Sequence, residues 1–453
     1  MKRTLYNQLV AWKNKSTRKP LILEGARQVG KTWLMKEFGK KEFENMVYVN
    51  CADEEFAKSL FSRNLKPDRI VRDVVANTRQ RIEAGKTLLV FDEIQEAPNG
   101  ITSLKYFCED APELHVMAAG SLLGVVHHPG ESYPVGKVDV LRLYPMSFEE
   151  FLWAKGYDKL AEILDECEWE SVAALGDTLE DLLRQYYFVG GMPEVVLDWV
   201  TKEDVLNIRE IQNRIIASYS NDISKHAGSE TERIRMVWNS IPAQLAKENK
   251  KFIYGAVKKG GRAKEFEVAI QWLVDAGLVL KIYRSKTPEM PLKMYEDFNA
   301  FKLFLLDVGL LGALAGTGPA QMIANNEVFM EFKGSFTENY VLQQLIPEHL
   351  LHIGYYSKEN SQVEIDFLVQ THSRIIPIEV KAEENVKSKS LRQFITMDHV
   401  DKKLKGLRCS MKPYVDQGWM ENIPLYSVLN YFRQQIKKET IELNYYAERK
   451  KEE

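Results

Sequence analysis

Short apolar runs alternate with amphipathic stretches between residues 20 and about 150. This is the pattern of a parallel β-sheet covered by helices. We expect a helix that continues from Trp33 to Phe38. The strands that we expect from the apolar runs lie at residues 21–23, 46–50, 87–91, 114–119 and 141–145.

The pattern becomes helical from residue 147 to about residue 225, with a break at residues 189–193. Helices that follow such a sheet are compatible with a lid domain that covers a ligand bound to it. Two more helices are expected at residues 234–246 and 264–276, and a short hairpin begins at Leu278. A helix that ends at a glycine and passes into a short hairpin suggests a winged helix.

Residues 363–369 alternate between apolar and polar side chains, and a polar turn joins them to the run 375–381. Pairing of these two strands would bring Asp366, Glu379 and Lys381 onto neighbouring positions. Two carboxylates and a lysine can bind magnesium and position water, and Glu338, in a helix expected to begin at Phe336, could add a further carboxylate. The alternative is an ordinary hairpin with salt bridges on its exposed face.

A phosphate-binding motif of the form G-x-x-x-x-G-K-T occupies residues 25–32, directly after the first apolar run. Its glycines let backbone N–H groups curl around phosphate oxygens, and the following helix adds positive potential. Lys31 can reach the terminal phosphates, and Thr32 can offer its hydroxyl to Mg²⁺. The residues that we expect at the nucleotide are Gly25, Arg27, Gln28, Val29, Gly30, Lys31, Thr32 and Trp33.

Two acidic residues, Asp92 and Glu93, follow the run 87–91. A carboxylate at the end of a strand beside the phosphate loop can hold hydrated magnesium. The adjacent glutamate can deprotonate the attacking water, which favours ATP hydrolysis over a GTPase-type switch. The alternative is that the two acids only start a helix. Ser121 is either a turn residue or a polar group that senses the γ-phosphate.

Length and composition narrow the class of protein. The chain has 453 residues, 45% of them hydrophobic and 28% charged, so we expect three or four globular domains. The four cysteines form no C-x-x-C pair, which indicates reduced thiols and argues against structural zinc. No signal peptide and no apolar run of membrane-spanning length is recognised, so a cytoplasmic protein without a membrane partner is expected.

The formal net charge of −3 gives no global field that would attract nucleic acid. A local basic stretch precedes the second helix of the expected winged helix. Its cations are Lys247, Lys250, Lys251, Lys258, Lys259, Arg262 and Lys264. They could neutralise DNA phosphates, or they could form a solvated loop.

These motifs resemble those of prokaryotic AAA-like ATPases that carry a C-terminal domain of unknown function with a restriction-endonuclease-like core. The resemblance covers nearly the whole chain. Besides the motifs above, the segments that carry it are residues 120–123, 145–151, 190–194, 306–310 and 336–341.

The resemblance implies an α/β fold with a AAA-like P-loop parallel-sheet domain, a helical lid, a winged helix and an α/β domain similar to PD-(D/E)xK nucleases. The expected domains are the ATPase core at 1–150, the lid at 151–224, the winged helix at 225–312, the nuclease-like domain at 325–432 and a charged helical tail at 433–453.

The resemblance also implies roles for single residues. Lys31 and Thr32 would serve ATP and Mg²⁺, Asp92 would hold Mg²⁺, Glu93 would be the catalytic base, and Ser121 would assist. Asp366, Glu379 and Lys381 would form the nuclease-like site, with Glu338, Asp366 and Glu379 as ligands of a second Mg²⁺.

Two positions depart from the family pattern. Ile365 stands where the nuclease motif has proline, and Lys137 stands where such ATPases often have arginine. The nearest alternative for an arginine finger is Arg142.

Two functions follow from the sequence. The leading hypothesis is ATP hydrolysis to ADP and phosphate coupled to DNA binding, with Mg-dependent DNA cleavage as a subsidiary hypothesis. The rival is an ATP-controlled protein-interaction switch whose nuclease-like domain is catalytically silent. A homo-oligomer or a protein partner is compatible with both.

Overall fold

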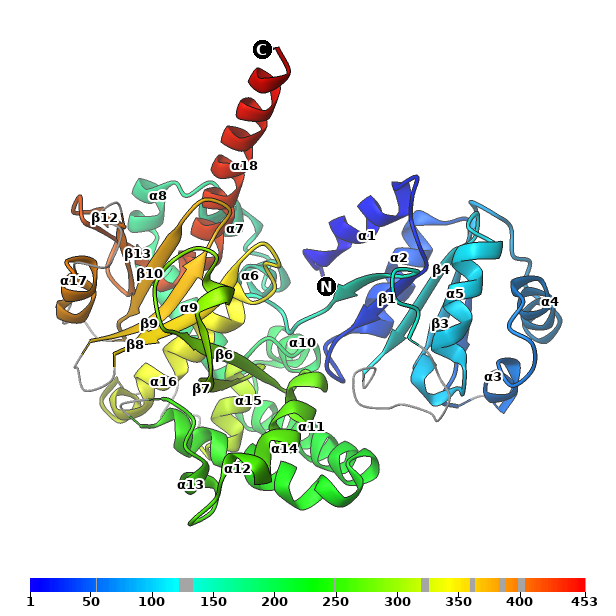
Figure 1. The fold of residues 1–453 in the computed structure, drawn as a ribbon, viewed down its shortest axis with the longest axis horizontal. Helices are drawn as coiled ribbons and strands as arrows, with labels where there is room; N and C mark the ends of the chain where they lie inside the picture. Colours follow the sequence, from blue (N-terminus) through cyan, green and yellow to red (C-terminus); the bar gives the residue numbers. More distant parts are fainter. Residues whose placement is uncertain are drawn as a thin grey trace. The chain divides into compact units, whose positions relative to one another are not determined.

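The computed structural model describes residues 1–53, 55–121, 133–247, 250–318, 326–358, 363–382, 388–397 and 404–452, without the side chains of 326–333 and 446–452 (Figure 1). Contacts divide the chain into two compact units. Unit 1 comprises Met1–Pro145, Tyr219–Ile234 and Val268–Leu278, and unit 2 comprises Met146–Ser218, Arg235–Glu267 and Val279–Glu453. The finer division into five domains stays a prediction.

Unit 1 is built on a parallel sheet with the strand order β2-β3-β4-β1-β5. Its strands are β1 (Leu21–Glu24), β2 (Asn45–Asn50), β3 (Thr87–Asp92), β4 (His115–Gly120) and β5 (Asp139–Arg142). Every residue of β3 and β4 is buried, because both faces of the middle strands are covered. The predicted parallel sheet is confirmed. The last strand was expected at 141–145 but begins at Asp139, since Asp139 pairs with Leu21 in register.

Helices pack on the sheet of unit 1 (Figure 1). They include α1 (Leu5–Asn14), α2 (Lys31–Glu42), α3 (Glu55–Leu60), α4 (Pro67–Thr78) and α5 (Gly100–Asp110). Alternate strand residues such as Ile22, Phe91 and Ala118 share one core with Ile70 of α4 and Leu104 of α5. This burial follows the two-residue period of the strands.

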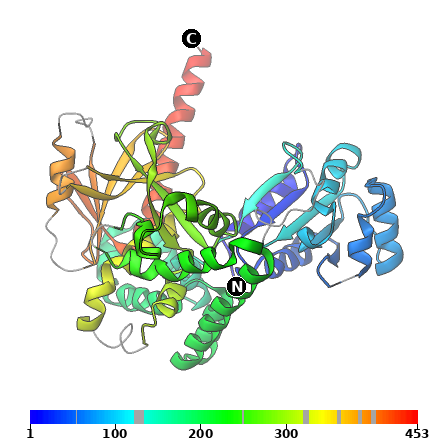
Figure 2. The same cartoon turned by 60° about the horizontal axis from the view of Figure 1, so that its bottom comes forward.

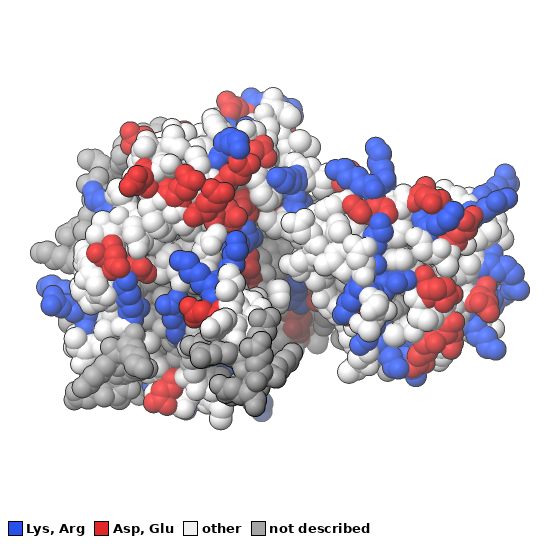
Figure 3. Space-filling model, turned by 90° about the horizontal axis from the view of Figure 1, so that it is seen from above, with Lys and Arg blue, Asp and Glu red and all other residues white. Residues whose placement is uncertain are grey.

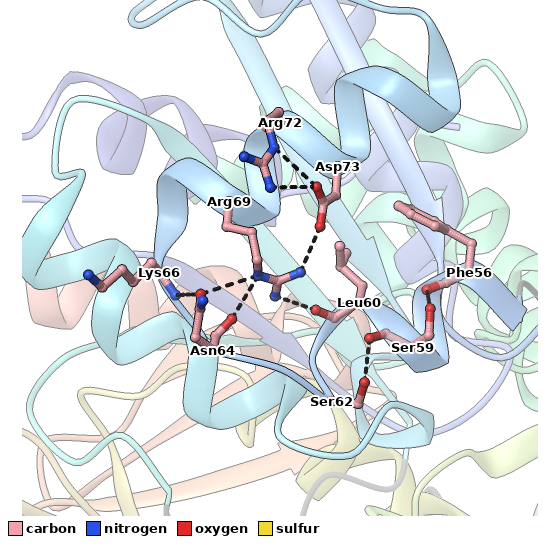
Figure 4. A network of polar contacts seen from close by, with 9 residues as sticks. All are labelled: Phe56, Ser59, Leu60, Ser62, Asn64, Lys66, Arg69, Arg72 and Asp73. Carbon is pink, nitrogen blue, oxygen red and sulfur yellow. Dashed lines mark hydrogen bonds and ion pairs between the residues drawn. The ribbon is translucent and has the colours of Figure 1, made fainter.

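Arg69 fixes the connection between α3 and α4 (Figure 4). Its guanidinium donates to the carbonyl oxygen of Leu60 at 2.5 Å, to the carbonyl oxygen of Asn64 at 2.9 Å and to Asp73 at 2.8 Å. A planar group with five donors can tie together chain segments that approach it from different directions.

Unit 2 contains an eight-stranded sheet with the order β12-β13-β11-β10-β9-β8-β6-β7. Its strands are β6 (Val279–Ser285), β7 (Glu296–Leu305), β8 (His352–Ser357), β9 (Glu364–Gln370), β10 (Ile375–Val380), β11 (Gly406–Ser410), β12 (Val415–Asp416) and β13 (Met420–Pro424). β9 runs antiparallel to β8 and β10, whereas β10 is parallel to β11 and β11 is parallel to β13.

Most of the remaining helices lie in unit 2, and some continue into unit 1 (Figures 1 and 2). They are α6 (Phe148–Ala154), α7 (Asp158–Asp165), α8 (Trp169–Ala174), α9 (Gly176–Val189), α10 (Pro193–Lys202), α11 (Val205–His226), α12 (Thr231–Leu245), α13 (Tyr254–Val257), α14 (Ala263–Asp275), α15 (Val308–Leu314), α16 (Asn326–Leu345), α17 (Lys389–Ile395) and α18 (Val428–Glu452). The predicted break at 189–193 is confirmed, because α9 ends at Val189 and α10 begins at Pro193.

Two expectations for unit 2 differ from the structure. The hairpin that we expected as the wing of a winged helix extends the large sheet instead, since Arg284 of β6 pairs with Tyr355 of β8. The helix expected to begin at Phe336 begins ten residues earlier, at Asn326. No local sequence motif marks β8 as the partner of β6, and none marks the turns of α16 that precede Phe336.

A buried carboxylate joins three segments of unit 2. Asp307 is fully buried and accepts hydrogen bonds from the backbone N–H of Gly191 at 2.6 Å, the N–H of Leu310 at 3.0 Å and the side-chain amide of Gln343 at 3.0 Å. Burial raises the pKa of Asp307, although these donors oppose the rise. The Cβ of an alanine at Gly190 would lie 2.2 Å from the Asp307 carboxylate, so glycine is required there.

Charged side chains of both signs are interspersed on the face of each unit drawn in Figure 3. Among the described residues, no helix combines the length and the apolar character needed to cross a bilayer.

Candidate functional site

The phosphate-binding motif forms a tight loop between β1 and α2 in unit 1. Gly25 has φ +146° and Gly30 has φ +96°, and the Cβ of an alanine at Gly25 would lie 2.3 Å from the carbonyl oxygen of Leu143. α2 starts directly at Lys31, so its first backbone N–H groups face the loop. We call residues 25–32 the P-loop.

Lys31 bends back over the P-loop. Its ammonium donates to the carbonyl oxygens of Gly25 at 2.8 Å and Ala26 at 2.9 Å. Burial lowers the pKa of Lys31 to about 8, while the charges of Glu93 and Asp92 oppose this shift. The ammonium is therefore largely protonated at pH 7 and can bind phosphate oxygens.

Asp92 lies at the end of β3, beside the P-loop. Its Oδ2 accepts hydrogen bonds from the Thr32 hydroxyl at 2.7 Å and from the Tyr48 hydroxyl at 2.8 Å. Burial and the bond to Asp92 raise the pKa of Tyr48, which keeps its hydroxyl protonated. A carboxylate and a hydroxyl in contact form the hard oxygen donor set that magnesium prefers, so these residues fit that ion.

Glu93 is held by two side chains. Its Oε2 accepts a hydrogen bond from the Gln95 amide at 2.7 Å and from the Ser121 hydroxyl at 3.3 Å. Its backbone is left-handed, with φ +50°. Such conformations are sparsely populated and cluster at functional sites. Ser121 directly follows β4, which ends at Gly120, and the structure brings it to the proposed base.

The P-loop also contacts the end of α11 that belongs to unit 1. Arg27 forms an ion pair with Asp222 at 2.5 Å, and the Tyr219 hydroxyl donates to the carbonyl oxygen of Arg27 at 2.9 Å. Burial raises the pKa of Asp222, which the Arg27 guanidinium opposes. From the N-terminus, Arg3 donates to the carbonyl oxygen of Val29 at 2.9 Å.

Sequence reasoning missed several residues of this site. Tyr219 and Asp222 lie almost 200 positions after the P-loop, and no local signal connects them to it. Tyr48 was detectable in principle, since β2 ends at the same sheet edge as β3. Trp33, expected at the nucleotide, has 45% of its surface exposed. Arg142 pairs with Glu24 at 2.9 Å.

The two strands of the expected nuclease-like site pair as predicted, with β9 antiparallel to β10. Asp366 lies on β9 and Glu379 on β10, and the Glu379 carboxylate pairs with Lys381 at 2.9 Å. Asp366 accepts the backbone N–H of Val380 at 2.7 Å. Burial and the negative charge of Glu338 raise the pKa of Asp366 to about 7.

The second magnesium site expected at Glu338, Asp366 and Glu379 falls in the part of the chain that the structure describes and stays a prediction. That part holds no group of three or more His, Cys, Asp or Glu side chains that could bind a metal ion. Lysine side chains contact two of the three expected ligands. Lys250 and Lys302 form ion pairs with Glu338, as Lys381 does with Glu379.

Three segments of the chain match known families. Residues 17–152 match a family described as AAA domain. Residues 180–321 and 333–428 match two families described as domains of unknown function, DUF8612 and DUF4143. Together with the parallel sheet and the P-loop, the first match shows an AAA-type P-loop ATPase-like domain in unit 1.

Solved structures with detectable similarity include a Walker-type ATPase of Pyrococcus abyssi, with 13% identity, a TM-score of 0.43 and coverage of 69% of this chain and 95% of that chain. The Aeropyrum pernix ORC1 protein, solved with DNA, has 14% identity, a TM-score of 0.30 and coverage of 69% and 90%. The Thermotoga maritima RuvB branch migration motor has 16% identity, a TM-score of 0.27 and coverage of 61% and 86%. No curated protein matches the chain.

Proposed function

We propose that the protein binds ATP and hydrolyses it to ADP and phosphate at the P-loop of unit 1. The observation that carries this proposal is the contact of Thr32 with Asp92 beside a glutamate that Gln95 and Ser121 hold in place. A phosphate loop, an acidic strand end and an adjacent carboxylate supply the parts that phosphoryl transfer to water needs.

Each residue has a distinct role in the proposed reaction. The Lys31 ammonium and the P-loop N–H groups bind the β- and γ-phosphates. Thr32 and Asp92 are the residues that would hold Mg²⁺, whose charge would offset that of the phosphates. Glu93 accepts a proton from the water that attacks the γ-phosphorus. The bond to the bridging oxygen breaks, ADP leaves, and the water oxygen remains in the phosphate product.

Glu93→Gln tests this proposal. The amide keeps the size of the side chain but cannot accept the proton, so we expect turnover to fall about 100- to 10,000-fold. ATP affinity, measured by calorimetry, should change little. Glu44→Gln, at an exposed position of the same unit, is the matched control and should keep full turnover. Equal phosphate release by Glu93→Gln and the wild type would remove Glu93 from this role.

DNA binding is a second candidate function, supported by exposed cations. Lys258, Lys259, Arg262 and Lys264 are exposed between α13 and the first turn of α14. Lys250, in contrast, is mostly buried in its ion pair with Glu338. The four exposed cations are free to approach a phosphate backbone in the way that the sequence suggested.

A salt titration separates this candidate from the rival protein-interaction switch. Four phosphate contacts would give a slope of about −3.6 in log K against log salt for duplex DNA. Replacing Lys258 and Lys259 with alanine should reduce that slope by about 1.8, while alanines at the exposed Lys40 and Lys41 should not. Absence of binding at low salt would favour the protein-interaction switch.

DNA cleavage forms no part of this proposal. Lysine side chains pair with Glu338 and Glu379, two of the three carboxylates that were expected to bind a second magnesium ion. The positive charge of these lysines also affects whether unit 2 can bind a divalent metal ion.

A further inference from the structure

A lysine lies inside the carboxylate cluster of unit 2, which we define as Glu338, Glu364 and Asp366. Lys302 projects from β7 and has a side-chain exposure of only 1%. Its ammonium lies 2.9 Å from Glu364 Oε1 and 4.0 Å from Glu338 Oε2. It also lies 4.8 Å from the centre of the Tyr355 ring. An ammonium this buried is tolerated only where negative charge surrounds it.

The charges of the cluster keep Lys302 protonated. Burial alone would lower the pKa of Lys302, but the carboxylates of Glu338, Glu364 and Asp366 raise it above its usual value. The ammonium therefore stays charged beside Glu364 and Glu338. A cation of the chain itself stands among the oxygens that would surround a bound metal ion.

A second lysine pairs with Glu338. Lys250 forms an ion pair with Glu338 Oε1, while Lys302 lies 4.0 Å from the buried Oε2, which has no hydrogen-bond partner among the described residues. Oδ2 of Asp366 accepts a hydrogen bond from the backbone N–H of Val380. Glu379 Oε1 is bound by Lys381, while its buried Oε2 has no hydrogen-bond partner among the described residues.

Ammonium groups of the chain itself already offset most of the negative charge at the cluster. Four carboxylates, those of Glu379 and the three cluster residues, face the ammonium groups of Lys250, Lys302 and Lys381. A divalent ion at the cluster would lie within a few ångströms of the Lys302 ammonium, in surroundings that screen charge poorly. The donor set therefore does not fit the magnesium ion that a nuclease-like fold implies.

We propose that the Lys302 ammonium occupies the cation position of the carboxylate cluster, so that unit 2 offsets most of this negative charge without a divalent metal and does not cleave DNA. The cluster is a structural ion-pair network held together by Lys302. It acquires affinity for a divalent cation only when that ammonium is removed.

Calorimetric titration of the full chain with Mn²⁺, in the absence of nucleotide, tests the proposal. The wild type should show no stoichiometric Mn²⁺ site. Lys302→Met removes the ammonium while keeping the length of the side chain, and it should bind one Mn²⁺ per chain at least tenfold more tightly than the wild type. Adding Asp366→Asn to that variant should abolish the new site.

Two results would overturn the proposal. One is stoichiometric Mn²⁺ binding by the wild type that Asp366→Asn removes, a comparison that needs no Lys302 variant. The other is a folded Lys302→Met protein that gains no Mn²⁺ affinity. If Lys302→Met does not fold, Lys302→Gln replaces it, because glutamine can still donate to Glu364. Failure of ATP hydrolysis would leave all these titrations interpretable.

Discussion

Replacing Asp307 with asparagine should strongly destabilise unit 2. The carboxylate accepts hydrogen bonds from Gly191, Leu310 and Gln343 in a site without solvent. Asparagine keeps one acceptor oxygen and turns the other into a donor that faces N–H groups. A hydrogen bond to a charged group contributes about 1.5–3 kcal/mol, and an unsatisfied buried donor adds a similar cost. The lower cost of burying a neutral side chain offsets part of this loss.

We therefore expect Asp307→Asn to lower the free energy of unfolding by about 3 kcal/mol, which corresponds to a Tm decrease of roughly 6–12 °C in a unit of this size. Urea unfolding followed by tryptophan fluorescence, to which the buried Trp238 of unit 2 contributes, measures the change. Asp181→Asn, at an exposed position of α9, is the control and should cost less than about 0.5 kcal/mol.

The same experiment reports on cooperativity. Asp307 lies in the segment 180–321 and Gln343 in the segment 333–428, which match different families. Because their side chains share a buried hydrogen bond, both segments should unfold in one transition. A loss of stability no larger than that of Asp181→Asn would refute this account of the Asp307 network.

Two further predictions concern stability. Gly190→Ala should lower the free energy of unfolding by more than about 3 kcal/mol, because the new Cβ would meet the Asp307 carboxylate. The control is Gly156→Ala, which has a similar positive φ but open space around it and should cost about 1 kcal/mol. Equal losses of stability in thermal unfolding would contradict the steric argument. Burial lowers the pKa of His115 to about 4, so the unfolded state takes up a proton at a higher pH than the folded state. His115 should therefore not reduce the free energy of unfolding above pH 6.5, and this free energy should decrease by about 3 kcal/mol as the pH falls towards 4. His115→Gln should flatten this part of the stability profile, and an unchanged slope would exclude His115 as the cause.

The geometry of the proposed ATP site was largely predictable because its determinants are local. The spacing of residues 25–32 and the position of Asp92 and Glu93 after a buried strand locate the phosphate loop and the acidic strand end. The sheet topology then brings both to one edge, as parallel strands require. The contacts of Asp222 and Tyr219 were not predictable, since they depend on how a distant helix end packs.

The second site shows where local patterns fail. The alternation at 363–369 located the strand of Asp366, but the sequence did not reveal which cations face it. Lys302 stands among apolar residues of β7, which is a signal of a buried lysine, yet its partners Glu338 and Glu364 come from other elements. Strand order decides such contacts. It also explains why the expected wing became part of the large sheet.

The central claim is that the P-loop binds ATP through Lys31, and calorimetry tests it most directly. The wild type, titrated with ATP in the presence of Mg²⁺, should bind one nucleotide per chain. Lys31→Ala removes a buried charge that would contact the phosphates, so its affinity should fall at least about 30-fold. A wild type that binds no ATP, or a Lys31→Ala variant that binds it equally well, would contradict the account.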